Sequence, residues 1–122
     1  MSICDAGMWE FPGGKVMQHE AAEQGLLREV KEEVGVTLQY KHTYPATFVF
    51  RKVTPYPMMF LLFWSDHFSG EARGCEGQDV RWLSLAELGT NQFPLLKNQH
   101  SFLAWLRANL DAHGQLDAGN GG

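Results

Sequence analysis

The stretch GKVMQHEAAEQGLLREVKEEVGV, residues 14–36, decides how the rest of this 122-residue chain is interpreted. It follows the pattern G-x5-E-x7-R-E-U-x-E-E-x-G-U without a missed position, where U is an aliphatic residue. The fixed positions are Gly14, Glu20, Arg28, Glu29, Glu32, Glu33 and Gly35. At ordinary residue frequencies, such a set of fixed positions matches by chance on the order of once in a billion starts. The stretch is therefore a motif and not an incidental run of glutamates.

Three glutamates of this motif share one face of a predicted helix over residues 20–33. Glu29, Glu32 and Glu33 stand at positions i, i+3 and i+4, which places their carboxylates on the same side. Apolar residues recur at helical spacing on the other side: Leu26, Leu27, Val30 and Val34. Like charges stacked in this way repel by roughly 0.2–0.5 kcal/mol per pair. A hard cation such as Mg²⁺ or Mn²⁺ would relieve that repulsion.

A solvated helix surface is the ordinary explanation for a Glu-x-x-Glu-Glu run. The complete motif argues against that explanation, and so does the segment WEFPGGK at residues 9–15. Within this segment, Pro12-Gly13-Gly14 predicts a tight loop whose backbone groups approach the carboxylates.

With these segments in place, the chain resembles the Nudix hydrolases and, among them, the MutT-like branch. WEFPGGKV leading into the motif is typical of that branch, and similar later landmarks are residues 74–78, Trp82 and Phe93-Pro94. The similarity covers about residues 7–110. It implies an α+β fold, namely a Nudix-type α/β/α sandwich with a mixed central sheet. We expect one domain over residues 1–110 and a flexible tail over residues 111–122.

The resemblance also implies a reaction, the metal-dependent hydrolysis of a nucleoside triphosphate to a monophosphate and pyrophosphate. In the MutT-like branch the substrate often carries an oxidised guanine, as in 8-oxo-dGTP, so the reaction sanitises the nucleotide pool. Water attacks phosphorus, and catalysis rests on positioning and on charge neutralisation by metal. By position, the implied ligands of Mg²⁺, or of Mn²⁺ in its place, are Glu29, Glu32, Glu33 and the backbone carbonyl of Gly13. Glu76 would bind metal or act as base.

Two further motif residues, Arg28 and Glu20, would orient the other groups. Substrate contacts follow the branch less closely. Phe11 is retained and is expected to pack against the base. Tyr56 stands where the branch has an arginine beside the nucleotide. Lys97, followed by Asn98, stands where the branch has the asparagine that recognises oxidised guanine. The resemblance therefore supports a nucleotide pyrophosphohydrolase better than it supports a preference for oxidised guanine.

Only residues 1–8 precede the WEFP segment, where the family has a full strand and hairpin. We therefore expect a sheet without its first strand, with unpaired backbone groups and an exposed edge. Either the true start lies upstream or the chain is a shortened form. The motif helix is also expected to be weaker than usual. Ala21 replaces a Ser or Thr cap, worth about 1 kcal/mol, and Gly25 costs about 1 kcal/mol relative to Ala.

Other elements follow from apolar patterning. Strands are expected at residues 36–40, 44–53 and 80–83, with residues 8–11 extended. The continuous apolar run at residues 58–65 favours a central strand buried on both faces. Residues 69–78 form a loop, and an amphipathic helix over residues 98–110 closes the domain.

Composition is that of a soluble globular protein, with 44% hydrophobic and 20% charged residues and a net charge of −4. The absence of a basic run disfavours polymeric nucleic acid as a partner and leaves a small-molecule nucleotide. The longest apolar run, residues 58–64, is too short to cross a bilayer. No signal peptide opens the chain, and Cys4 and Cys75 read as free thiols, so we expect a cytoplasmic protein. Monomer and homodimer both remain open.

Two alternatives remain at this stage. The chain could be a Nudix hydrolase of another nucleoside diphosphate derivative, although Pro45, Pro55 and Tyr56 do not fall clearly at the distances that mark ADP-ribose or dinucleoside polyphosphate enzymes. It could also be a shortened, non-catalytic form that binds nucleotides or regulates a partner.

Overall fold

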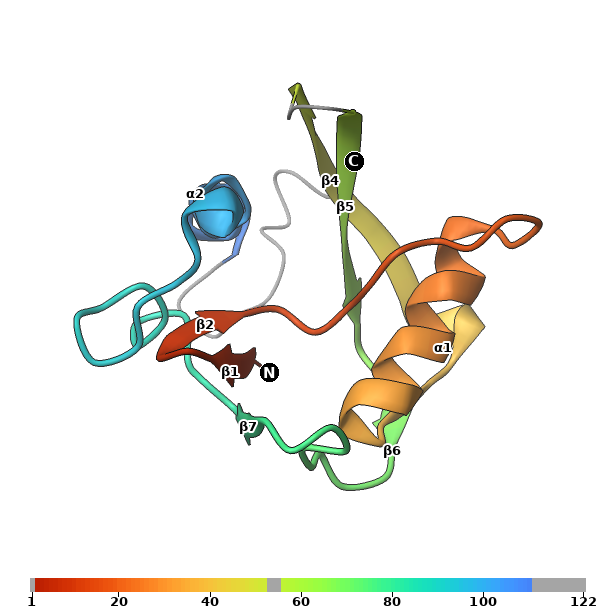
Figure 1. Ribbon diagram of the computed structural model, residues 1–122, viewed down its shortest axis with the longest axis horizontal. Coiled ribbons are helices and arrows are strands. Elements are labelled where there is room, and N and C mark those ends of the chain that lie inside the picture. The colour runs from red at the N-terminus through yellow and green to blue at the C-terminus, as the bar shows by residue number, and fades with distance from the viewer. Residues whose placement is uncertain (1, 53–55, 111–122) are drawn as a thin grey trace.

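The computed structural model, which describes residues 2–52 and 56–110, combines helices with antiparallel strands (Figure 1). The elements are β1 Ser2–Asp5, β2 Met8–Glu10, α1 Ala22–Val34, β3 Thr37–Leu38, the 3-10 turn Tyr40–His42, β4 Thr43–Lys52, β5 Pro57–Ser65, β6 Phe68–Ser69, β7 Asp79–Arg81, the 3-10 turn Lys97–Gln99 and α2 His100–Asn109. This mixture confirms the expected α+β class. The expected tail, residues 111–122, lies outside the described residues.

Helix α1 carries the glutamate motif and begins two residues later than expected. Its first residue follows Ala21, which has no side chain able to cap the helix. The Gln24 side chain replaces part of the missing cap, because its Oε1 accepts a hydrogen bond from the Ala21 N–H at 2.8 Å. Gly35 ends the helix as expected. It adopts a left-handed conformation with φ 74° and donates its N–H to the Lys31 carbonyl.

The apolar face of α1 forms the main core. Val30 and Val34 pack with Val36 and with Ile3 of β1, and all of these side chains are buried. Leu26 of the helix and Val80 of β7 pack against this cluster from its rim. The sheet that contains β1 therefore covers the apolar side of α1, as the helical periodicity predicts, and Glu33 is buried at the border of that side.

Residues ahead of the WEFP segment form a short strand, Ser2–Asp5, where the sequence predicted that the full first strand and hairpin of the family are lacking. β1 lies in the centre of a three-stranded sheet with the order β2-β1-β7 and is antiparallel to both neighbours. Ile3 is paired with Glu10 on one side and with Val80 on the other. A tight turn at Ala6-Gly7, with φ of 53° and 81°, allows so short a segment to fold back on itself.

The hairpin of β4 and β5 stands apart from this sheet. The two strands pair with each other from Thr43↔Ser65 to Lys52↔Pro57, with an irregularity at Pro45. Neither strand joins another sheet within the described residues. Figure 1 shows the free end of the hairpin rising away from β1, β2 and α1. Pairing in the described sheets is antiparallel, and a single bridge between Trp9 and Leu95 is parallel.

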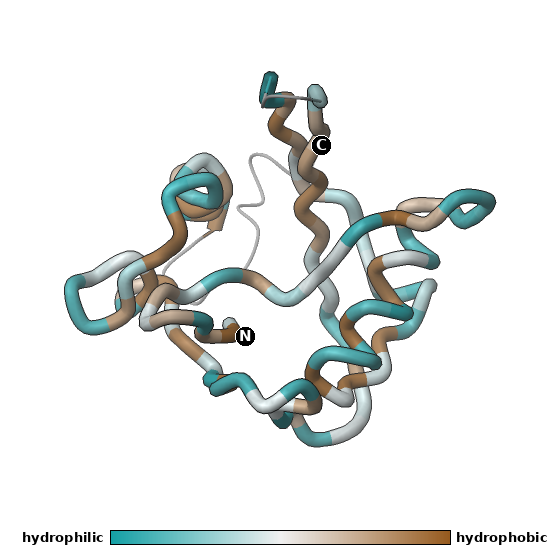
Figure 2. The backbone as a smooth tube through the Cα atoms, viewed as in Figure 1, coloured by the Kyte–Doolittle hydropathy of each residue, from teal (hydrophilic) through white to brown (hydrophobic). Residues whose placement is uncertain are grey.

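The prediction that residues 58–65 form a strand buried on both faces is wrong. The strand exists as β5, but Met58, Met59 and Leu61 are exposed and only Leu62 is buried. The reason is that β5 pairs with β4 alone, so that one face of the hairpin has no covering layer in the described structure. Figure 2 shows hydrophobic colouring continuing along the hairpin toward its free end.

Helix α2 confirms the expected closing helix. Its Phe102 and Leu103 are buried, and Leu103 joins a second core cluster with Leu88 and Leu95. The Leu96 N–H donates to the Trp9 carbonyl, and the Trp9 N–H donates to the Pro94 carbonyl, so the segment before α2 is tied to β2. None of the helices in the described part of the chain is long and apolar enough to cross a membrane.

Candidate active site

Arg28 on α1 is the centre of a network of carboxylates. Its Nη2 and Nε donate to the two carboxylate oxygens of Glu20 at 2.7 and 3.2 Å. Its Nη1 donates to Glu29 at 2.9 Å and to Glu32 at 3.3 Å. Nη2 also reaches the Lys15 carbonyl at 3.2 Å, which fastens the loop before the helix. The hydrogen bonds from Arg28 hold the pKa of Glu20 below its usual range. The orienting role of Arg28 and Glu20 stays a prediction.

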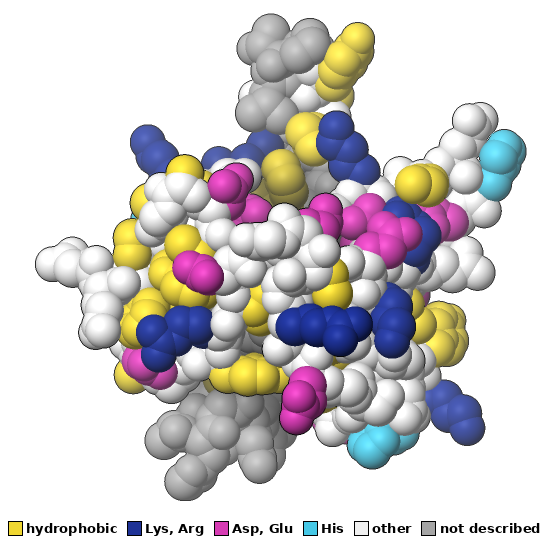
Figure 3. Space-filling model, turned by 60° about the horizontal axis from the view of Figure 1, so that its bottom comes forward, with side chains coloured by type: hydrophobic (Ala, Val, Ile, Leu, Met, Phe, Trp, Pro, Cys, Tyr) yellow, Lys and Arg dark blue, Asp and Glu magenta, His cyan; other side chains and the backbone are white. Residues whose placement is uncertain are grey.

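The glycine loop lies against two of the motif glutamates. The Gly13 N–H donates to Glu33 Oε2 at 3.3 Å. A Cβ atom added at Gly14 would overlap the carboxylate of Glu29, so any other residue here would displace that carboxylate. The loop therefore brings backbone groups to the glutamates, as the Pro-Gly-Gly sequence predicts. Figure 3 shows acidic side chains gathered beside a basic one on this side of the molecule.

Gly25 has a structural reason to be present in α1. A Cβ atom at this position would lie 3.0 Å from Glu20 Oε1, which Arg28 holds in place. The same Glu20 oxygen accepts a hydrogen bond from the Met17 N–H at 2.6 Å. The glycine that weakens the helix thus leaves room for the carboxylate that ties the preceding loop to it.

Glu33 is the most buried carboxylate of the site, with 8% of its surface exposed. Burial raises its pKa to about 7, although the hydrogen bond from Gly13 acts in the opposite direction. The negative charges of Glu76, Glu10 and Glu29 raise the pKa further. Burial also raises the pKa of Glu10, with Asp5 adding to the effect. Glu33 therefore lies among other negatively charged side chains.

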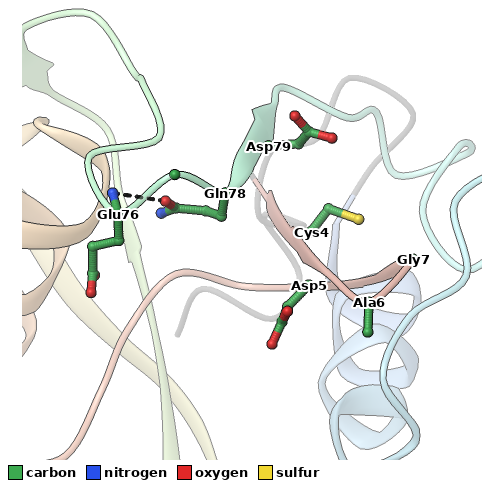
Figure 4. A pocket seen from close by; sticks show the side chains of 8 residues that line it. Cys4, Asp5, Ala6, Gly7, Glu76, Gln78 and Asp79 are labelled. Carbon is green, nitrogen blue, oxygen red and sulfur yellow. Dashed lines mark hydrogen bonds between the residues drawn. The ribbon is translucent and has the colours of Figure 1, made fainter.

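The loop that contains Glu76 is fastened to the end of α1. The Gln78 Nε2 donates to the Glu33 carbonyl at 2.8 Å, and the Cys75 N–H donates to the same oxygen at 3.1 Å. The Gln78 Oε1 in turn accepts the Glu76 N–H at 2.9 Å, as Figure 4 shows. The structure thus brings Glu76 to the acidic helix. The anchoring role of Gln78 was not found from the sequence, because no local pattern connects it with α1.

A shallow cleft of about 340 Å³ lies beside Glu76. The turn between β1 and β2 lines one side, and the loop before β7 lines the other; the lining residues are Cys4, Asp5, Ala6, Gly7, Glu76, Gly77, Gln78 and Asp79. Three carboxyl groups stand on its walls. A phosphate group could enter this cleft only with a cation to offset their charge.

Oxygen donors of this kind fit a hard divalent cation. The site offers carboxylates on α1, a carboxylate on the Glu76 loop and the backbone of the glycine loop, and the neighbouring carboxylates raise the pKa of Glu33. Within residues 2–52 and 56–110, however, no group of three Asp, Glu, His or Cys side chains is arranged closely enough to hold an ion as it stands. Glu29 and Glu32 instead contact Arg28.

Of the expected substrate contacts, Phe11, Lys97 and Asn98 come together at the start of α2. The Phe11 N–H donates to the Gln99 Oε1 at 2.8 Å, which joins it to the 3-10 turn that contains Lys97 and Asn98. The Phe11 ring also lies 6.5 Å from the ring of Phe102. Tyr56, in contrast, is 73% exposed next to the first residue of β5, at the free end of the hairpin.

Arg51 on β4 was missed by sequence reasoning. Its Nη2 donates to the Ser101 hydroxyl at 3.2 Å on the first turn of α2. Its Nε is buried without a hydrogen-bond partner in the described structure. The alternation of β4 could have indicated this inward direction, since Arg51 shares a strand face with Val49 and not with the exposed Phe48 and Phe50.

Comparison with known proteins agrees with this geometry. The NUDIX domain family matches residues 3–106. An 8-oxo-dGTP diphosphatase of Escherichia coli is 39% identical over 93 residues, which are 73% of this chain and 67% of that protein. The 8-oxo-dGTP diphosphatase of Haemophilus influenzae is 35% identical over 103 residues, covering 77% of this chain and 74% of its own length.

A solved structure shares the fold as well. The MutT NUDIX hydrolase from Burkholderia pseudomallei superposes with a TM-score of 0.70 at 27% sequence identity. The superposition covers 83% of this chain and 78% of the other.

Proposed function

This chain belongs to the NUDIX domain family, and from that premise we propose that it hydrolyses 8-oxo-dGTP to 8-oxo-dGMP and pyrophosphate. The expectation of a Nudix pyrophosphohydrolase is confirmed by the family match and by the relatives named 8-oxo-dGTP diphosphatase. The names of the family and of these relatives agree with a nucleotide substrate. Nudix hydrolases in general depend on a divalent metal.

The single observation that carries the proposal is the environment of Glu33. This carboxylate is nearly buried, lies near other carboxylates and accepts a backbone N–H from Gly13, so a positive charge beside it would stabilise its ionised form. We assign Glu29, Glu32, Glu33, Glu76 and the Gly13 carbonyl as the groups that hold Mg²⁺, or Mn²⁺ in its place. A bound ion would neutralise charge on the phosphates and make a water molecule more acidic.

The remaining residues position these groups. Arg28 restrains Glu20, Glu29 and Glu32 from one side, and Gln78 holds the Glu76 loop from the other. In the reaction, the oxygen of a water molecule bonds to phosphorus, and the P–O bond between the α- and β-phosphates breaks. The carboxylate of Glu76 either takes part in metal binding or accepts the proton that the water loses.

The base is proposed to lie between β2 and α2. Phe11 offers an aromatic face, while Asn98 offers an amide that can both donate and accept hydrogen bonds. Lys97 supplies a positive charge, and Arg51 adds donors on the neighbouring face of β4. Tyr56 remains a proposed contact with weaker support, because it is exposed at the free end of the hairpin.

A substrate panel tests the proposal. We expect pyrophosphate release from 8-oxo-dGTP to exceed release from dGTP, CTP and ATP at equal concentration, and to stop when EDTA removes the divalent metal. ADP-ribose and NADH serve as substrates of the alternative reaction type. If the protein hydrolysed ADP-ribose or NADH but none of the triphosphates, the proposal would be wrong, and the substrate would be another nucleoside diphosphate derivative.

A further inference from the structure

Arg51 on β4 is a half-buried cation without an acidic partner in the described structure. Its guanidinium forms no ion pair within residues 2–52 and 56–110, and residues 43–65 contain no Asp or Glu. Its Nη2 donates to the Ser101 hydroxyl at 3.2 Å, while its Nε is buried without a partner. Arginines that leave solvent are ordinarily paired, so this guanidinium has donors available for an acceptor that a ligand supplies.

The start of α2 places Arg51 beside the proposed site for the base. Ser101 lies one helical turn after Asn98, and residues at this spacing project from the same side. The next residue, Phe102, has its ring 6.5 Å from the ring of Phe11. Arg51, Asn98 and Phe11 therefore converge on the start of α2, although they come from distant parts of the sequence.

The strand face that carries Arg51 is otherwise apolar. Val49 lies two residues before Arg51 on this face, and their cross-strand partners on β5 are Phe60 and Met58. Val49 and Phe60 are partly buried, whereas Met58, directly opposite Arg51, is 37% exposed. The face is therefore open to solvent beside the guanidinium. An apolar surface with a few convergent polar groups suits a heterocyclic base, which has apolar faces and a polar edge.

The hydrogen-bond chemistry of Arg51 determines which base it favours. A guanidinium donates hydrogen bonds and accepts none. Guanine and 8-oxoguanine both carry the accepting oxygen O6, whereas adenine carries a donating amine at the same place. An arginine donor therefore favours both guanine bases over adenine, and O6 gives it no means of distinguishing one guanine from the other.

We propose that Arg51 is a specificity-determining residue that donates to O6 of the base and selects guanine nucleotides over adenine nucleotides. Ser101 holds the guanidinium in place through its hydroxyl. This inference rests on the proposed function and deepens it by naming the group that selects the class of base. The distinction between oxidised and ordinary guanine stays with Lys97 and Asn98.

Pyrophosphate release from 8-oxo-dGTP, dGTP and dATP tests the role of Arg51. We expect the kcat/KM of wild type for each guanine nucleotide to be at least about tenfold above that for dATP. Arg51→Gln should remove most of this preference, because an amide both donates and accepts and can pair with the adenine edge. The ratio between 8-oxo-dGTP and dGTP should change by less than about twofold, since both bases carry O6.

Lys52→Gln is the matched control, because it removes the same charge from the next residue of β4, which is exposed on the opposite face. It should leave the preference for guanine unchanged. Arg51→Lys is a second variant that keeps the charge and loses the fork of donors, so it should retain only part of the preference. Circular dichroism with a thermal melt establishes that each variant is folded.

Calorimetric titration with dGMP and dAMP separates this inference from the proposed reaction. If wild type released pyrophosphate from none of the triphosphates but bound dGMP more tightly than dAMP, and Arg51→Gln lost this difference, the reaction would be wrong and the role of Arg51 would stand. Equal binding of the two monophosphates by wild type would overturn the inference. Equal losses of kcat/KM for all three triphosphates in Arg51→Gln, or an unchanged preference in both Arg51 variants, would overturn it as well.

Discussion

At the scale of single residues, Glu33 gives the metal-free protein an unusual dependence on pH. Its pKa in the folded state is about 7, above the ordinary value near 4.5, so the folded state binds the proton more tightly than the unfolded state. The stability from this residue is complete at low pH and is lost as the pH rises from about 4.5 through about 7. The loss is roughly 1–3 kcal/mol.

Thermal unfolding in EDTA at pH 5.5 and pH 8 measures this effect. Wild type should unfold at a lower temperature at pH 8, and Glu33→Gln should remove most of the difference, because an amide does not ionise. Glu23→Gln is the control, since Glu23 lies in the first turn of the same helix and outside the glutamate motif. If wild type and Glu33→Gln lost stability equally, the assigned cause would be wrong.

Arg28 supports a second prediction at this scale. Its guanidinium contacts Glu20 through two nitrogens while also reaching Glu29, Glu32 and the Lys15 carbonyl. A lysine in its place keeps the charge but loses this fork of donors. Arg28→Lys should therefore reduce kcat/KM by roughly ten- to a hundred-fold through looser positioning of the glutamates. Steady-state kinetics with a metal titration checks this, and an unchanged rate would show that the network does not orient the site.

At the scale of elements, the N-terminus of α1 lacks a side-chain cap, and adding one should stabilise the protein. Ala21 has the extended backbone of a helix cap, with φ −75° and ψ 159°, but lacks a side chain to use it. Ala21→Ser should raise the free energy of unfolding by about 1 kcal/mol, because the hydroxyl can accept the N–H of Gln24. Chemical denaturation measures the change. Ala22→Ser is the control within the first turn, and an equal gain there would exclude capping as the cause.

Elements whose boundaries and buried face are marked by local sequence signals were predictable. The motif helix was placed within two residues at each end, because Gly35 marks the C-terminus and the apolar periodicity marks the face. Helix α2 followed from its amphipathic pattern for the same reason. The helix face of the candidate site was predictable too, since Glu29, Glu32 and Glu33 have a fixed spacing on one element.

Features that depend on distant partners were not predictable. The apolar run of β5 is compatible with burial or with an open face. Which of the two occurs depends on whether another layer covers the hairpin, and none does so within residues 2–52 and 56–110. The strand at residues 2–5 depends on pairing with β7, far along the chain. Gln78 and Arg51 gain their roles from contacts with α1 and α2 that no local pattern encodes.

At the scale of the whole molecule, the proposed site for the base depends on how α2 and its preceding turn meet β2. Phe11 is joined to this turn through Gln99, so Lys97 and Asn98 are placed beside it. Asn98→Ala and Lys97→Ala should change the ratio of kcat/KM between 8-oxo-dGTP and dGTP by about five-fold or more, with a smaller change in kcat. Asn91→Ala, in the exposed loop before Phe93, is the control. Unchanged ratios in both variants would place the base elsewhere.

The central claim is that a divalent metal held around Glu33 supports pyrophosphate release from a nucleoside triphosphate. The most direct measurement is the initial rate of pyrophosphate release from 8-oxo-dGTP over a Mg²⁺ titration, for wild type, Glu33→Gln and Glu23→Gln. We expect saturable Mg²⁺ activation in wild type and Glu23→Gln, and a fall in kcat of at least a hundred-fold in folded Glu33→Gln. A rate in Glu33→Gln close to that of wild type at saturating Mg²⁺ would contradict the account.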